Sequence, residues 1–432
     1  MAATTVVSRE NIESWPADSP KLRLFRRAVE EMQALSDQAV MDNRGYQWVA
    51  GVHGGFGDGP FCQHGTAHFL TWHRAYLLDM ELKLRARIAE IADTATADEW
   101  RLPYWDWAAP GVTLPAAFTD ETYDDDGTRK PNPLFSEPYQ LDQDPDGLDP
   151  RSPTWRGPLS AGMFDDLGAL VDSALDEDTW RFFSNALENP HNLVHVRVGG
   201  FMATFRSSFD PIFWVHHAHI DFRFWEWQQR HGGIGTIPQS VRDFECQPFQ
   251  FRDIRASAFL DTRDLGYTYT TTRSPVLVPP EQPDADRQTV LSIPTGPVPD
   301  GFSRARINLH NVQHPEDPVV LRFFADRDSP PDASTPTTAG EHFLIDRAVL
   351  GHGPCPGAPG HCDPTPSPIT GADLRPPHHL APFDIGITVT RNLNAALGAG
   401  PEHTVSMIAL DQHGVQQPLS ALRFDNATVT VT

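Results

Sequence analysis

The sequence is poor in cysteine and in positive charge, and it has no long apolar run. Four cysteines in 432 residues are too few for a disulfide framework. Lysine and arginine number 34 against 57 aspartates and glutamates, and the net charge of −23 argues against nucleic acid or a membrane surface as partner. Neither a membrane-spanning run nor a signal peptide is visible. We therefore expect a cytoplasmic protein by default, with export alongside a partner protein left open.

Helical and strand-like patterns divide the chain into two parts. Apolar stripes predict helices over residues 20–35, 67–91 and 166–185 and from Asp210–Pro211 to Gly232–Gly233. The acidic residues 119–157, rich in Pro, Asp and Gly, predict a long surface loop. Alternating patterns predict strands over 319–324, 342–350, 383–389, 405–410 and 427–431. The predicted fold is mainly α: a helical domain over 1–275, a linker over 276–300 and a β-sandwich domain over 301–432.

Two histidine clusters stand out among the 19 histidines. His191 and His195 are spaced i, i+4, so on a helix both imidazoles leave the same face and can hold one metal ion. His216 and His217 follow about twenty residues later. In the other cluster His64 and His73 are nine residues apart, about 900° around a helix. His64 must then lie in the loop before the helix that carries His73.

Carboxylates are absent from both clusters at ligand spacing. The HExxH motif of zinc proteases and the Glu-x-x-His pairs of di-iron bundles are missing. Any one histidine could be a buried neutral ring, but few packed cores need so many polar rings together. Two three-histidine sites without a carboxylate favour copper, while a zinc site of a non-redox hydrolase remains an alternative.

Specific motifs extend this pattern. They are Cys62-x-His64, His73–Arg74 within FLTWHRAYL, LPYWDW at 102–107, HNLVH at 191–195 and DPIFWVHH at 210–217. Together they resemble the type-3 copper family of tyrosinases, catechol oxidases and molluscan haemocyanins over most of residues 50–230. With its C-terminal domain, the chain looks closest to a bacterial polyphenol oxidase that carries a shielding domain.

The resemblance implies a four-helix bundle that holds two copper ions, with O2 as co-substrate. Carried over by position, the copper A ligands are His53, in the glycine-rich loop 51–60, with His64 and His73; the copper B ligands are His191, His195 and His217. His68 and His219 are expected outside the ligand set.

Further residues near the ligands also match the family. The spacing of Cys62 and His64 implies a thioether link, with a free buried thiol as the alternative. Arg74 and Asp221 resemble a structural pair beside the site, and an ordinary ion pair would explain them equally well.

Two positions bear on the substrate. Asn192 matches the residue that helps to hold an activating water in monophenol hydroxylases, but the glutamate expected nine or ten residues upstream is replaced by Phe182 and Phe183. Glu188 is nearer in sequence but is expected to point elsewhere on the helix. Phe205 could narrow the approach to copper A, although it could equally be a packing aromatic.

We therefore favour oxidation of o-diphenols or o-aminophenols to o-quinones, with a small phenol as the partner molecule. A true tyrosinase with monophenol hydroxylase activity is the alternative, and haemocyanin-like O2 binding is the alternative of another class.

The C-terminal domain resembles the family's shielding domain in its strand pattern and in residues 339–351. The resemblance implies a latent enzyme that proteolysis near 270–300 would activate. His352, Cys355, His361 and Cys362 form a compact group, read as a Cys355–Cys362 disulfide or two thiols, or as a transient landing site for Cu(I) from a possible copper donor protein.

Overall fold

The computed structural model describes residues 6–54, 61–139, 153–270, 290–295, 298, 302–326, 329–338, 340, 342–351, 383–397, 403–424 and 426–431. The predicted copper landing site at 352–362 and most of the predicted linker lie outside these ranges. None of the described helices is both long enough and apolar enough to cross a membrane.

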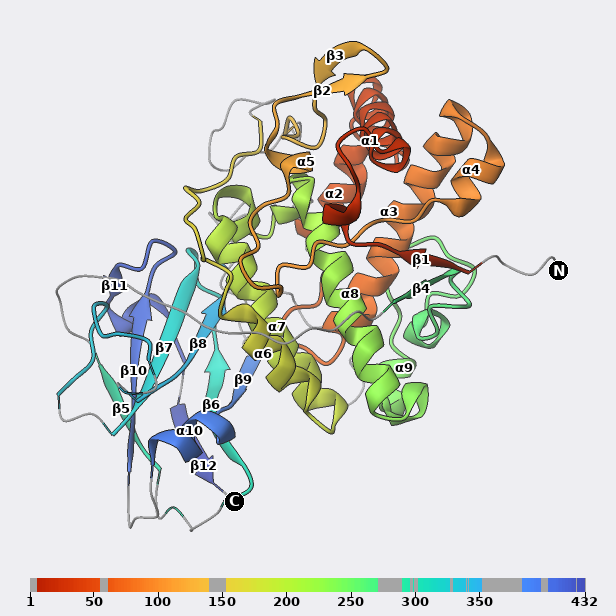
Figure 1. Cartoon of the computed structure of the whole chain (residues 1–432). Helices are drawn as coiled ribbons and strands as arrows, with labels where there is room; N and C mark the ends of the chain where they lie inside the picture. Colours follow the sequence, from red (N-terminus) through yellow and green to blue (C-terminus); the bar gives the residue numbers. More distant parts are fainter. Residues whose placement is uncertain are drawn as a thin grey trace.

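The first part of the chain is helical, and the last part forms two sheets beside it (Figure 1). The helices are α1 (Pro20–Gln38), α2 (Tyr46–Gly54), α3 (Phe69–Ile91), α4 (Thr94–Glu99), α5 (Ala116–Thr119), α6 (Leu167–Leu175), α7 (Trp180–Val198), α8 (Ile212–Arg230), α9 (Gln239–Arg242) and, among the strands, α10 (Thr390–Ala396). The predicted fold class, a helical domain followed by a β-sandwich, is confirmed.

The predicted helices need two corrections. The helix expected over 166–185 is two helices, because the chain leaves the helical path between Leu175 and Trp180 and α7 then continues through HNLVH to Val198. His53 lies near the end of α2 and not in a glycine-rich loop. The loop was predicted from the glycines that follow His53, although the residues that precede it are apolar and form the helix.

The predicted long loop over 119–157 contains a hairpin. Strands β2 (Thr122–Asp125) and β3 (Thr128–Pro131) pair antiparallel around Asp126–Gly127, both of which have positive φ angles. An Asp-Gly pair with positive φ at both positions is typical of a type I′ hairpin turn. The sequence prediction overlooked this pair within a generally acidic stretch.

The C-terminal strands form two stacked sheets. One has the order β11 (Gln416–Gln417), β10 (Thr404–Leu410), β7 (Val319–Ala325), β8 (Phe343–Val349), with β5 (Leu291–Pro294) also paired to β10. The other has the order β12 (Asn426–Val431), β6 (Ala305–Val312), β9 (Phe383–Thr388). Residues 291–294, within the predicted linker, therefore belong to the first sheet.

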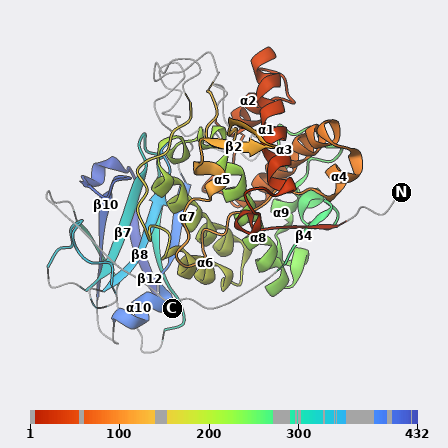
Figure 2. The same cartoon turned by 45° about the horizontal axis from the view of Figure 1, so that its top comes forward.

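Side-chain alternation makes the first sheet a middle layer. Along β7, Leu321 and Phe323 pack in the core between the sheets, whereas Val320 and Phe324 join the core of the helical part. Successive side chains of a strand point to opposite faces, so both faces of this strand are buried. Figure 2 shows α7 against β8, at the border of the two parts.

Buried charges join the N-terminal strand to the helices. Strand β1 (Val7–Arg9) pairs parallel with β4 (Tyr267–Tyr269). Asp221 accepts hydrogen bonds from Arg74, from Arg9 at 3.1 Å and from Tyr267 at 2.7 Å. Burial disfavours the charged carboxylate, but Arg74 and Arg9 outweigh it and lower the pKa of Asp221. The Arg74–Asp221 pair is thus part of a buried network.

Replacing Asp221 with asparagine should therefore be costly. We expect Asp221→Asn to lower the free energy of unfolding by about 3–5 kcal/mol, because the buried Arg74 guanidinium loses its counter-charge and Arg9 keeps only Glu81. Asp253→Asn is the control, since Asp253 pairs with Arg255 on the surface, where an ion pair adds little. Urea denaturation measures both, and equal stability of the two variants would contradict the role of the network.

Candidate metal centre

Six buried histidines from five segments meet inside the helical part. The list is His53 on α2, His64 in the loop before α3, His73 on α3, His191 and His195 on α7, and His217 on α8. The loop position of His64 and the helical position of His73 agree with the spacing argument.

The copper B candidates form a tight triangle. Nε2 of His191 lies 3.1 Å from Nε2 of His217 and 3.1 Å from Nε2 of His195, and the third side is 3.3 Å. Nitrogen ligands about 2.0–2.1 Å from one ion at tetrahedral angles lie about 3.3 Å apart. The triangle therefore has the dimensions of a three-nitrogen metal site, and His217 rather than His216 supplies its third corner.

The copper A candidates gather beside this triangle. Nε2 of His53 lies 3.2 Å from Nε2 of His64, and the ring centroids of His64 and His73 are 5.0 Å apart. His73 and His217 stack with centroids 4.6 Å apart, so the two trios are adjacent. Nε2 of His73 is buried without a hydrogen-bond partner among the described residues, as expected for a ligand atom.

Fixed acceptors orient these rings. Nδ1 of His53 donates to the Phe205 carbonyl at 2.8 Å, Nδ1 of His73 to the Phe69 carbonyl at 2.7 Å, and Nδ1 of His195 to the Met202 carbonyl at 2.6 Å. A carbonyl only accepts, so the proton resides on Nδ1 and the lone pair on Nε2. The Nε2 lone pairs then point to the centre, ready to bind metal.

Burial keeps the imidazoles neutral. It lowers the pKa of His53 to about 4 and the pKa values of the other five well below the usual value. Neutral imidazole is the form that binds a metal ion. The all-nitrogen donor set and the unpartnered Nε2 atom of His73 fit copper.

Glu188 was misjudged from the sequence. Its Oε1 accepts a hydrogen bond from the backbone N–H of Gly65 at 2.8 Å and lies 3.3 Å from Nδ1 of His64. Burial raises the pKa of Glu188 to about 7, although Arg347 and the Gly65 N–H oppose this. Glu188 faces the pocket because it lies four residues before Asn192, on the same helix face. The four-residue spacing from Asn192 could have predicted from the sequence that Glu188 faces the pocket.

The other candidates lie around the cluster. His68 stacks on Phe244, and His219 interacts with Asp106 and Arg223, so both lie outside the trios as expected. Phe183 stacks on Trp227 and Phe182 lies beneath Arg306, so these two positions bring no carboxylate to the site. The Asn192 side-chain oxygen accepts from His191 Nδ1 at 2.8 Å.

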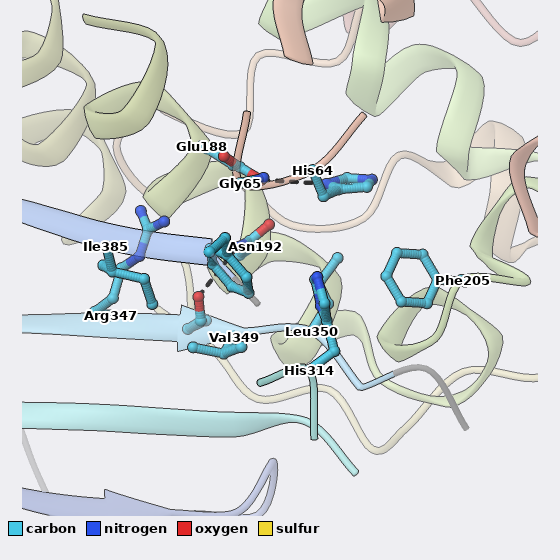
Figure 3. Close-up of a pocket in the computed structure, with 12 residues that line it drawn as sticks. His64, Gly65, Glu188, Asn192, Phe205, His314, Arg347, Val349, Leu350 and Ile385 are labelled. Atoms are coloured by element: carbon cyan, nitrogen blue, oxygen red, sulfur yellow. Dashed lines mark hydrogen bonds and ion pairs between the residues drawn. The ribbon is translucent and has the colours of Figure 1, made fainter. Parts of the chain in front are cut away.

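A pocket leads to the copper A side between the helical part and the sheets. Figure 3 shows His64, Glu188 and Phe205 on its helical side and His314, Val349 and Leu350 opposite them. Phe205 is buried, and its ring centroid lies 5.7 Å from that of His64. Phe205 therefore stands where it can narrow the approach to this side.

Comparison with known proteins agrees with this geometry. The family model described as the common central domain of tyrosinase matches residues 43–230. The tyrosinase of Streptomyces antibioticus is 34% identical over 220 residues, which cover 46% of this chain and 77% of that protein.

Solved structures share the fold of nearly the whole chain. Deoxygenated hemocyanin from Rapana thomasiana aligns with a TM-score of 0.67 at 16% identity, covering 99% of each chain. Tyrosinase from Burkholderia thailandensis at high pH aligns with a TM-score of 0.64 at 17% identity, covering 98% of this chain and 100% of that one. Both are similar to this chain in fold.

The site and these matches define a type-3 copper protein. The chain belongs to the tyrosinase family. Proteins of this family use two copper ions with O2.

The thioether is a prediction that mass spectrometry can test. Cys62 is a buried free thiol in the structure, and its sulfur lies within 4.8 Å of ligand nitrogens of His53 and His64. After the protein has been loaded with copper in air, stripped of metal, denatured and reduced, we expect it to be lighter than its calculated sequence mass by two hydrogen atoms. The S–C bond replaces an S–H and a ring C–H, and O2 takes up the two protons and two electrons. Cys62→Ser should show its own calculated mass. An unshifted wild-type mass would mean that Cys62 stays a thiol.

Proposed function

We propose that the protein oxidises o-diphenols, or related o-aminophenols, to o-quinones with O2. The observation that carries the proposal is the pair of adjacent trios of Nε2 atoms. His53, His64 and His73 would hold one copper ion, and His191, His195 and His217 the other. The copper pair, when bound, passes electrons from the phenol to O2. Each diphenol loses two electrons and two protons, and two turnovers reduce one O2 to two waters.

The residues around the trios have separate roles in this proposal. The carbonyls of Phe205, Phe69 and Met202 fix the imidazoles before any metal arrives, so little reorganisation accompanies binding. The Phe205 ring limits access to the copper A side, and the rings of Phe69 and Phe213 also pack against its imidazoles.

A preference for diphenols is supported by Phe182 and Phe183, because neither can accept the proton of an incoming monophenol. The alternative, a true tyrosinase, is favoured by one observation: Glu188 and Asn192 line the same pocket. A carboxylate there could serve as the proton acceptor that hydroxylation needs.

Oxygen uptake with catechol and with a matched monophenol separates these activities in the activated protein. We expect immediate uptake with catechol and slow or lagging uptake with the monophenol. Glu188→Gln should leave the ratio of the two rates unchanged. Brisk, lag-free monophenol turnover that falls about 100-fold or more in Glu188→Gln would instead make the protein a tyrosinase with Glu188 as its base. Reversible O2 binding without catechol turnover would indicate a carrier.

We further propose that the enzyme is latent while its C-terminal domain is present, with that domain as a cap over the pocket. His314 and Phe383 stack with ring centroids 4.6 Å apart, and His314 lies edge-on to Phe205 at 5.8 Å. Phe383 also packs against the backbone beside His64: a Cβ atom on Gly65 would lie 2.5 Å from the Phe383 ring. A phenol approaching the copper A side would meet these two rings.

Hydrogen bonds hold the cap to α7. The side-chain amide of Asn189 donates to the Asp346 carbonyl at 2.7 Å, and its oxygen accepts from the Ala348 N–H at 3.2 Å. Asn192 donates to the Ala348 carbonyl at 3.0 Å. Strand β8 is thus fastened along the helix that carries His191 and His195.

Removing the Phe383 ring from the cap should activate the enzyme. We expect Phe383→Ala to oxidise catechol about tenfold or more faster than the wild-type chain, because a ring that covers the pocket is removed without a change to the trios. Phe424→Ala is the control, since Phe424 packs against the sandwich core. Initial rates of quinone formation measure both. A wild-type chain that is already as fast as Phe383→Ala would contradict latency.

A further inference from the structure

His216 is a buried histidine that the proposed site does not use. Its side chain is fully buried, and neither ring nitrogen has a hydrogen-bond partner among the described residues. A buried polar group without a partner destabilises the fold, because it gives up its hydrogen bonds to water and gains none in return. Nε2 of His73 is unpartnered in the same way, and there the proposed copper ion explains it. A metal ion would satisfy a ring nitrogen of His216 in the same way.

The ring of His216 belongs to the copper B cluster by position. It stacks on His191 with centroids 4.9 Å apart and an interplanar angle of 21°, and it stands edge-on to His195 at 4.7 Å. One nitrogen from each of His191, His195, His216 and His217 lies within 4.8 Å of the others. Small movements of the His216 ring would therefore bring a fourth nitrogen to the ion held by this trio.

The number of ligands decides what such a site can do. Three protein ligands leave a position open for a reactant, whereas four ligands around a d10 ion make a closed tetrahedral site. Cu(I) and Zn(II) are both d10 ions that accept imidazole. A fourth imidazole at copper B would hold an ion firmly and deny it the open position that O2 needs.

We propose that His216 is a fourth ligand for a single d10 ion bound by His191, His195 and His217 while the copper A trio is empty. A singly loaded protein then has a closed, four-imidazole site, which retains its first metal ion before the pair is complete. This inference rests on the proposed function, because it takes the copper B trio as a metal site.

Zinc titration of the metal-free protein, residues 1–432, tests the proposal. We expect His216→Phe to bind the first Zn(II) equivalent at least tenfold more weakly than the wild type in competition with a chelator, while the second equivalent is unaffected. X-ray absorption of the protein with one equivalent of zinc should count four imidazoles in the wild type and three in His216→Phe.

Two further variants complete the experiment. His68→Phe removes a histidine that stacks on Phe244 outside the cluster, and it should bind zinc as the wild type does. His216→Asn keeps a polar side chain and replaces His216→Phe if the latter does not fold. An unchanged first affinity in a folded His216 variant, with three imidazoles in the wild type, would overturn the proposal. A wild-type protein that binds no metal at the trios would instead overturn the proposed function.

Discussion

The orientation of the imidazole rings is the constraint on which the site depends. A histidine presents Nε2 to a metal only when something holds the Nδ1 proton, and backbone carbonyls do this for His53, His73 and His195. Two of these carbonyls, of Met202 and Phe205, come from the short connection between α7 and α8. This one connection, residues 199–211, therefore orients one imidazole ring in each trio.

Glycines allow the connection between α7 and α8 to pass close to α2 and to the backbone at Trp155. Gly200 has a φ angle of +59°, and a Cβ atom there would lie 2.0 Å from the Trp155 carbonyl oxygen. A Cβ atom on Gly54 would lie 2.4 Å from the Phe205 carbonyl oxygen, the acceptor for His53. Side chains at these two positions would push the connection outward and turn the rings away. The metal centre thus depends on backbone positions that hold no ligand themselves.

Much of this could be predicted from the sequence, because local spacing decides it. The i, i+4 pair placed His191 and His195 on one face, and the nine-residue spacing separated His64 from the helix of His73. The spacing of Glu188 and Asn192 indicates that they share a helix face, but the hydrogen-bond partner of Glu188 is the N–H of Gly65, more than a hundred residues away. No local pattern reports that contact. Likewise, the strand pattern predicted β8, but only the folded chain pairs it with Asn189 and Asn192.

Helix α7 links the metal centre to the cap. Its residues Asn189 and Asn192 bind β8, while His191, on the same two turns, faces His64 and His73 of the other trio. Asn192 joins the two directly, since its oxygen accepts from His191 and its amide nitrogen donates to the Ala348 carbonyl. The Asn192 side chain therefore keeps both hydrogen bonds while β8 lies against α7. Because the sheet also shares the helical core through Val320 and Phe324, complete removal of the cap would expose apolar surface to water. A local displacement around Phe383 and His314 would open the pocket without that cost.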